Sequence, residues 1–137
     1  MTALRVRDLM TSHVYSLSMG DDLYAVQNLM DEHNVRHVPV VDEDGDLVGL
    51  VSMRDLLRAA SPSDDELPLE MREARMHSRR VSDVMTEEVA TTEPDTPLEE
   101  AAALMLENKF GCLPVLEGLR LAGILTESDF VRYFAGD

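Results

Sequence analysis

Two pairs of a hydroxyl residue and an aspartate, each with the same spacing, are the residues of this chain best suited to binding chemistry. Ser52 lies three positions before Asp55, and Thr126 lies three positions before Asp129. A hydroxyl and a carboxylate at this spacing form a capping pair at a helix N-terminus, because they accept hydrogen bonds from backbone amides that the helix leaves free. Each pair therefore predicts the start of a helix, and its polar groups are candidates for ligand contacts.

Other reactive residues do not form a recognisable catalytic or metal site. Cys112 is flanked by apolar residues and has no histidine partner repeated around it, which favours a small buried thiol over a nucleophile. The four histidines, His13, His33, His37 and His77, lack the regular spacing of metal ligands. There is also no Gly-rich phosphate loop of the Walker or Rossmann type. We therefore expect no enzyme, no metal site and no required cofactor.

The composition excludes several classes of partner. The 137 residues include 27 acidic and 12 basic side chains, which gives a formal net charge of −15. Such a surface repels nucleic-acid backbones and anionic membranes, and no apolar run approaches the roughly 20 residues that a membrane span requires. We expect neither nucleic acid nor membrane as a partner. The N-terminus has no apolar signal core and there is one cysteine, so we expect a cytoplasmic location.

The chain repeats itself at an offset of 75 residues, which becomes 74 after a turn. Residues 6–11 match residues 81–86 at the first offset, and Gly49 matches Gly123 at the second. The lost residue falls between positions 40 and 47, where a loop tolerates a deletion. A unit this small with one apolar face needs a second unit to cover it. The two copies should therefore fold against each other.

Each copy predicts the same element order of strand, helix, strand, strand and helix. Short extended segments come first, at residues 14–17 and 89–92. A helix then begins at a capping residue, Asp21 or Thr96, and in the second copy Pro97 and Glu99 add a first-turn proline and a capping-box glutamate. Apolar residues at helical spacing follow and should be buried: Leu23, Val26, Leu29 and Met30, and Leu98, Ala101, Leu104 and Met105.

A hairpin and a closing helix complete each copy. The β-rich runs lie at residues 35–41 and 47–51 in the first copy and at residues 112–116 and 119–125 in the second. The closing helices begin at the two capping pairs. We accordingly divide the chain into a first domain at residues 1–60, a linker at residues 61–80 and a second domain at residues 81–137.

The linker is polar and changes from acidic to basic along its length. It contains Ser-Pro-Ser at residues 61–63, acidic residues at 64–66 and a helix-prone run at residues 69–77. It is interpreted as a solvated connector helix, with a docking segment for a partner as the alternative.

Three motifs in each copy resemble the CBS domain, and their tandem arrangement resembles a Bateman module. The motifs are Asp-Leu-Met-Thr at residues 8–11 and Asp-Val-Met-Thr at 83–86, His-Val-Pro-Val-Val at 37–41 and Cys-Leu-Pro-Val at 112–115, and Gly-Leu-Val-Ser-Met-Arg-Asp at 49–55 and Gly-Ile-Leu-Thr-Glu-Ser-Asp at 123–129. Any one motif is weak evidence. Three in the same order, twice, at a nearly constant offset, are specific.

The resemblance implies a mixed α/β (α+β) fold of two β-α-β-β-α repeats packed around a pseudo-twofold axis. It also implies two clefts that can hold an adenine-containing ligand, namely AMP, ADP, ATP or S-adenosylmethionine, and the pairing of two chains into a homodimer. The resulting hypothesis is a regulatory CBS pair whose ligand occupancy signals to a partner protein of unknown identity. The alternatives are a ligand-free dimerising adaptor, or a module for S-adenosylmethionine or NAD.

The resemblance also assigns roles to the residues of the last motif. It implies that Asp55 and Asp129 accept hydrogen bonds from ribose hydroxyls, while the Ser52 and Thr126 hydroxyls and the helix amides lie near phosphate. Arg54 is then the candidate for a phosphate contact. Arg36 is a second candidate, with a solvated arginine at the end of the strand as the alternative. Ser128 takes the place of Arg54 in the second copy, so the two clefts should differ. The shortage of cations also favours a less anionic ligand, such as S-adenosylmethionine or adenosine.

By the same analogy the adenine pockets would be lined by segments of both copies. Their candidate residues are Thr11, Ser16, His37 and Pro39, and Thr86, Thr91, Cys112 and Pro114. A plain core or edge-strand role is the alternative for His37 and Cys112. The two prolines cannot donate a backbone hydrogen bond, so they predict a strand margin that is open to ligand or solvent.

Overall fold

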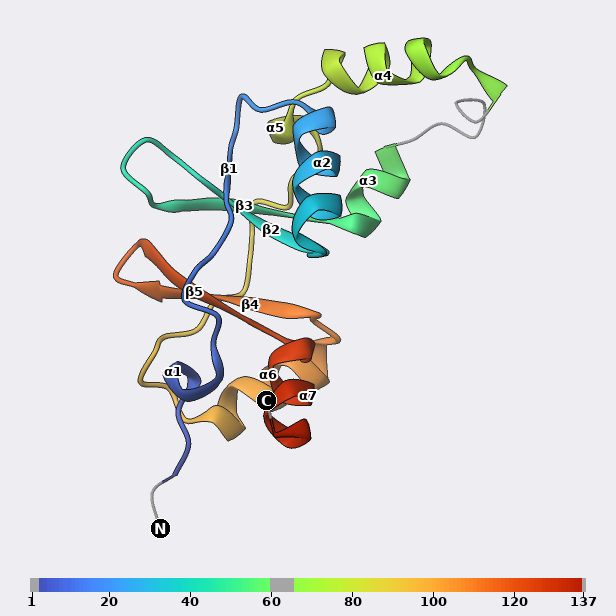
Figure 1. Cartoon of the computed structure of the whole chain (residues 1–137). Coiled ribbons are helices and arrows are strands. Elements are labelled where there is room, and N and C mark those ends of the chain that lie inside the picture. Colours follow the sequence, from blue (N-terminus) through green and yellow to red (C-terminus); the bar gives the residue numbers. More distant parts are fainter. Residues whose placement is uncertain (1–2, 60–65, 137) are drawn as a thin grey trace. The chain divides into compact units, whose positions relative to one another are not determined.

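The computed structural model describes residues 3–59 and 66–136 (Figure 1). It has the predicted mixed α+β architecture. The elements of the first repeat are α1 (Val6–Leu9), β1 (Leu17–Ser18), α2 (Leu23–His33), β2 (His37–Val41), β3 (Leu47–Ser52) and α3 (Met53–Ala59). Then follow α4 (Leu69–Ser78), α5 (Val81–Val84), α6 (Leu98–Asn108), β4 (Cys112–Glu117), β5 (Arg120–Thr126) and α7 (Glu127–Ala135). None of the described helices is long and apolar enough to cross a membrane.

Most predicted elements form close to their expected bounds, and the first strand of each repeat is shorter than expected. In the first repeat β1 is reduced to Leu17 and Ser18, which pair in parallel with β2. In the second repeat only Thr92 makes the equivalent bridge, to Val115. The predicted linker helix forms as α4. Residues 61–65 of the predicted linker lie outside the described residues.

Two compact units make up the chain, and each unit draws on both repeats. Unit 1 comprises Met1–Val14, Gly45–Leu47 and Val89–Asp137, and unit 2 comprises Tyr15–Asp44 and Val48–Glu88. The leading segment of each repeat therefore packs with the body of the other repeat. Figure 1 shows this as α1 beside α6 and α7, and as α5 beside α2.

Paired backbone hydrogen bonds fix each leading segment to the last strand of the other repeat. In unit 1 the N–H groups of Thr11 and Ile124 each donate to the other residue's carbonyl, both at 2.9 Å. In unit 2 Thr86 and Leu50 form the equivalent pair, at 2.9 and 3.0 Å. The two exchanges occur at equivalent positions, so the duplication extends to this crossing of the chain.

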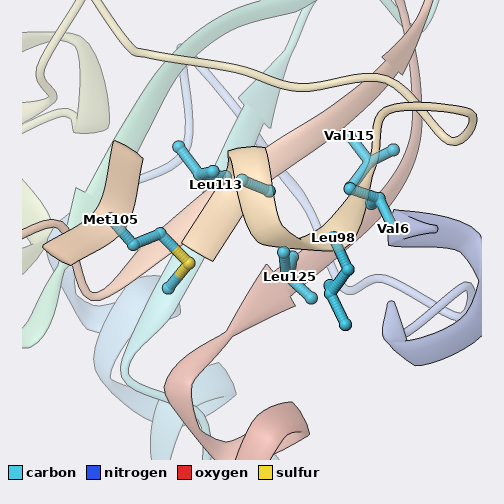
Figure 2. Close-up of a cluster of buried hydrophobic side chains, with 7 residues drawn as sticks. Val6, Leu98, Met105, Leu113, Val115 and Leu125 are labelled. Atoms are coloured by element: carbon cyan, nitrogen blue, oxygen red, sulfur yellow. The ribbon is translucent and has the colours of Figure 1, made fainter. Parts of the chain in front are cut away.

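The hydrophobic cores of the two units match at six of their seven positions, the exceptions being Leu98 in unit 1 and Leu17 in unit 2. The core of unit 1 consists of Val6, Leu98, Ala101, Met105, Leu113, Val115 and Leu125 (Figure 2). That of unit 2 consists of Leu17, Val26, Met30, Val38, Val40, Val51 and Val81. The predicted apolar stripes of α2 and α6 are thus confirmed as core. Val6 and Val81 are fully buried, and each completes the core built by the other repeat.

The caps of the long helices differ from the sequence prediction. Asp22, not Asp21, caps α2, because its Oδ1 accepts a hydrogen bond from the Ala25 N–H at 2.9 Å. Asp21 instead accepts from the Ser18 N–H, one turn earlier in the chain. Helix α6 begins after Pro97, which occupies the N-cap position, so the predicted side-chain cap by Thr96 does not form.

Helix α4 attaches to α2 through a polar contact. The Nδ1 atom of His77 lies 2.9 Å from Oδ2 of Asp22, and the His77 ring packs on Tyr24 with centroids 4.4 Å apart. The hydrogen bond with His77, and after it that from Ala25, holds the pKa of Asp22 below its ordinary value of 3.8. One carboxylate therefore both caps α2 and holds α4.

The backbone crossings predict a specific cost for adding a methyl group at Gly123. A Cβ there would lie 2.8 Å from the Thr11 carbonyl oxygen, whereas at Gly49 it would meet chiefly the flexible side chain of Met85. We expect Gly123→Ala to lower the free energy of unfolding by about 1–3 kcal/mol, as overpacking does, and Gly49→Ala to cost less. Urea denaturation measures both. Gly20→Ala is the control, since nothing lies within 4 Å of its Cβ, and a similar loss for this variant would contradict the explanation.

The dual role of Asp22 predicts a dependence of stability on pH. Its pKa is lowered in the folded state, so its stabilising effect is complete above the unfolded pKa of roughly 3.9 and is lost as pH falls through the lower folded value. At pH 7 we expect Asp22→Ala to lose about 1 kcal/mol of unfolding free energy, while Asp22→Asn, which still caps, loses less. Denaturation at pH 7 and pH 3 should show the gap between wild type and Asp22→Asn shrinking in acid. An unchanged gap would argue against a stabilising role of the ionised Asp22 carboxylate.

Candidate functional site

The first predicted capping pair lies where β3 passes into α3 in unit 2. The Oδ2 atom of Asp55 accepts from the Ser52 N–H at 2.7 Å and from the Ser52 hydroxyl at 3.0 Å. The Asp55 N–H is 3.3 Å from the Ser52 oxygen, to which it donates. The prediction of a reciprocal cap is confirmed here. It fixes the Asp55 carboxylate at the end of the strand.

The second pair has the same arrangement where β5 passes into α7 in unit 1. The Oδ2 atom of Asp129 accepts from the Thr126 N–H at 2.8 Å and from the Thr126 hydroxyl at 3.2 Å. The Thr126 side chain in turn caps the backbone of the first turn. Both motifs thus build the same structure from a strand end and a helix start.

The remaining oxygen of each carboxylate distinguishes the two junctions. Oδ1 of Asp129 accepts from the Thr11 hydroxyl at 2.9 Å and from Nη2 of Arg132 at 2.8 Å, and only 3% of the Asp129 side chain is exposed. Oδ1 of Asp55 has no hydrogen bond from any residue that the structure describes, and this residue is half-buried. The Asp55 carboxylate therefore keeps an oxygen for a further donor.

Three further predicted residues lie around the Asp55 junction. The carbonyl oxygen of Arg36 accepts from the N–H of Met53, the first residue of α3, at 2.8 Å. Arg54 follows on the first turn of α3 and is exposed. Thr86 pairs with Leu50 on β3 and is also exposed.

The strand residues of the predicted adenine pockets are mostly buried. Cys112 pairs with Thr126 across β4 and β5, and burial raises the pKa of its thiol to about 12, which suits core packing and not a nucleophile. His37 is half-buried on β2. Pro39 and Pro114 are fully buried, so the predicted open strand margin is wrong.

The structure does not bring the other predicted site residues together. Ser16 and Ser128 are exposed, in the segment before β1 and on the first turn of α7. Thr91 lines an open groove of about 530 Å³ along α6, together with Thr92, Thr96, Glu100 and Leu104 among others. None of the residues that contact Asp129 lines this groove, so Thr91 lies apart from the capping motif.

Arg132 is the residue of the site that the sequence analysis missed. It lies three positions after Asp129 and forms an ion pair with it. Arg58 stands at the equivalent position after Asp55 and makes no ion pair with that aspartate in the described part of the chain. The repeated Asp-x-x-Arg spacing is visible in the sequence, because residues three apart on a helix are neighbours.

Comparison with known proteins identifies the family. The model of the CBS domain matches residues 6–62 and 81–136. A CBS domain-containing protein of Dictyostelium discoideum is 34% identical over 131 residues, which cover 92% of this chain and 88% of that protein.

Two solved structures extend the comparison to ligands. The structure of CBSX2 in complex with AMP is 33% identical, has a TM-score of 0.79 and covers 96% of both chains. The CBS domain pair of protein MJ0100, in complex with 5-methylthioadenosine and S-adenosyl-L-methionine, is 25% identical with a TM-score of 0.78, over 96% of this chain and 99% of that one. With both repeats matched in sequence and in fold, this chain belongs to the CBS domain family.

Proposed function

We propose that this chain is a regulatory module that binds an adenine nucleotide, AMP, ADP or ATP, at its strand-helix junctions and passes the occupancy on to a partner protein. It would sense the energy state through these nucleotides and carry out no catalysis itself. The CBS pairs that bind AMP or S-adenosyl-L-methionine in their solved structures support this class of ligand.

The proposal is best supported by the second carboxylate oxygen of Asp55, Oδ1, which accepts no hydrogen bond from the described residues. Both cap bonds at this junction go to Oδ2, so Oδ1 can accept from a ribose hydroxyl without loss of the cap. A bond of this kind to a carboxylate is charge-assisted and is stronger than one between neutral groups. Arg54, the exposed residue immediately before Asp55 in the chain, supplies a cation for the phosphate.

Two alternatives make different use of the same groups. S-adenosylmethionine or NAD would keep the ribose contact, and the shortage of cations favours the former because it carries no phosphate. A ligand-free adaptor would use Ser52, Asp55, Thr126 and Asp129 only as helix caps, a role that their mutual hydrogen bonds already fulfil.

We also propose that the chain forms a homodimer through α6 and α7. Leu106, Val131 and Phe134 on these helices are 82%, 67% and 83% exposed. Large apolar side chains with exposures this high favour burial against another protein surface. A second copy of the chain offers the same residues, as a twofold interface requires.

Nucleotide binding predicts a ligand-dependent rise in thermal stability. At about 100 times its dissociation constant, a ligand adds roughly 2.7 kcal/mol per site, which raises the Tm of a chain of this size by several degrees. Dye-monitored unfolding with AMP, ADP, ATP, NAD and S-adenosylmethionine would measure it for wild type, Asp55→Ala and Asp129→Ala. Each shift is taken from the variant's own ligand-free Tm, because removal of a cap itself costs about 1 kcal/mol.

Asp31→Ala, on the exposed face of α2, is the matched control and should keep the full shift. We expect AMP to raise the Tm of wild type and Asp55→Ala to lose most of that rise. No shift with any of the five ligands would favour the adaptor.

The proposed dimer predicts a change of mass when its apolar surface is made polar. Replacing Phe134 and Leu106 by glutamate should leave the fold intact, because both side chains are largely exposed, and should convert a dimer into a monomer. Sedimentation velocity measures this. The matched control is Leu57→Glu, since Leu57 is 69% exposed on α3. A monomeric wild type would refute the interface.

A further inference from the structure

We propose that the two junctions are unequal because Arg132 occupies the ligand-binding carboxylate of the second one. The chain thereby holds an internal competitor in unit 1, and an adenine nucleotide fills the Asp55 junction first. This inference rests on the proposed function, since it concerns how the same two aspartates are regulated.

The argument begins with the hydrogen-bonding capacity of the two carboxylates. An ionised carboxylate offers about four acceptor positions. Asp129 receives four donors: the N–H and hydroxyl of Thr126, the hydroxyl of Thr11 and the guanidinium of Arg132. It is therefore saturated, and a ribose hydroxyl could bind only by displacing one of these groups.

Asp55 has the same residue types as Asp129 at the two further donor positions and a different set of contacts. Its equivalents of Thr11 and Arg132 are Thr86 and Arg58. Asp55 receives two donors, both from Ser52, and within the described residues neither Thr86 nor Arg58 donates to it. The contacts thus differ although each aspartate has a threonine and an arginine at these two donor positions.

Of the four groups that donate hydrogen bonds to Asp129, the guanidinium of Arg132 is the one that a ligand can displace. Its side chain is 56% exposed, so its guanidinium can return to solvent when a ligand hydroxyl takes over its contact with Asp129. Thr11, in contrast, is held by its backbone bonds to Ile124. Ligand entry at this junction therefore requires Arg132 to leave, which lowers the affinity and does not abolish it.

The first test needs no ligand. A double-mutant cycle with Arg132→Gln and Asp129→Asn should show a coupling of about two- to fivefold in the folding equilibrium constant, the size expected of a weak ion pair. The matched cycle with Arg58→Gln and Asp55→Asn should show none. Equal coupling in the two cycles, or none at Asp129, would overturn the inference whatever the protein binds.

The second test measures AMP binding by titration calorimetry in an Asp55→Ala background, which leaves the Asp129 junction as the binding site. Adding Arg132→Gln should tighten AMP binding about two- to fivefold, by removal of the competing ion pair. Adding Arg58→Gln should change nothing. If Arg132→Gln leaves the affinity unchanged or weakens it, then Arg132 is not a competitor.

The two proposals fail in distinguishable ways. If AMP binds to wild type and the affinity at Asp129 does not respond to Arg132→Gln, the inference falls and the proposed function stands. If neither wild type nor any variant binds AMP while the coupling at Asp129 is found, the ion pair is real and the proposed use of the junction for AMP is wrong.

Discussion

The exchange of leading segments between the repeats is the constraint on which the rest of the structure depends. Thr11 and Thr86 pair through their backbones with the last strand of the other repeat. This pairing places Val6 of the first repeat in a core formed by the second repeat, and Val81 of the second repeat in a core formed by the first. It also explains the glycine that opens the last motif in each repeat, since a Cβ at Gly49 or Gly123 would meet the crossing segment.

The same crossing builds the two strand-helix junctions of the candidate site. Each aspartate is fixed by a residue two positions beyond the crossing point on its strand: Ile124 pairs with Thr11, and Thr126 caps Asp129. The Thr11 hydroxyl can reach Asp129 only because the backbone bonds hold it there. A site of this kind needs both repeats even though its residues lie within one compact unit.

The parts of this structure that could be predicted from sequence are those with local causes. The hairpins, the apolar stripes of α2 and α6 and the capping pairs follow from periodicity and short spacings, which act within a few residues. Helix α1 was missed because its four residues are too few to show a period, and its cap depends on Asp8 accepting from the Arg5 N–H. The cap of α2 was misplaced by one residue, because Asp21 and Asp22 are equivalent as types.

The site was predicted only in part for the same reason. The Ser-x-x-Asp and Thr-x-x-Asp pairs are local and were found. The bond from Thr11 to Asp129 joins residues 118 positions apart, and no pattern in a single sequence reveals such a contact. Pro39 and Pro114 were expected at an open strand margin because they lack an N–H. They are instead fully buried, because the side chains packed around them exclude solvent.

The division of the chain between the units has a consequence for the order of folding during synthesis. All segments of unit 2 lie within residues 15–88, whereas unit 1 joins residues 1–14 to residues 89–137. Because synthesis proceeds from the N-terminus, unit 2 can therefore fold before residues 89–137, the partner of residues 1–14, have been made. Closing so long a loop is entropically costly and slow compared with local pairing. Residues 1–14 are thus synthesised before unit 2 and become fixed in the structure only after residues 89–137 have been made.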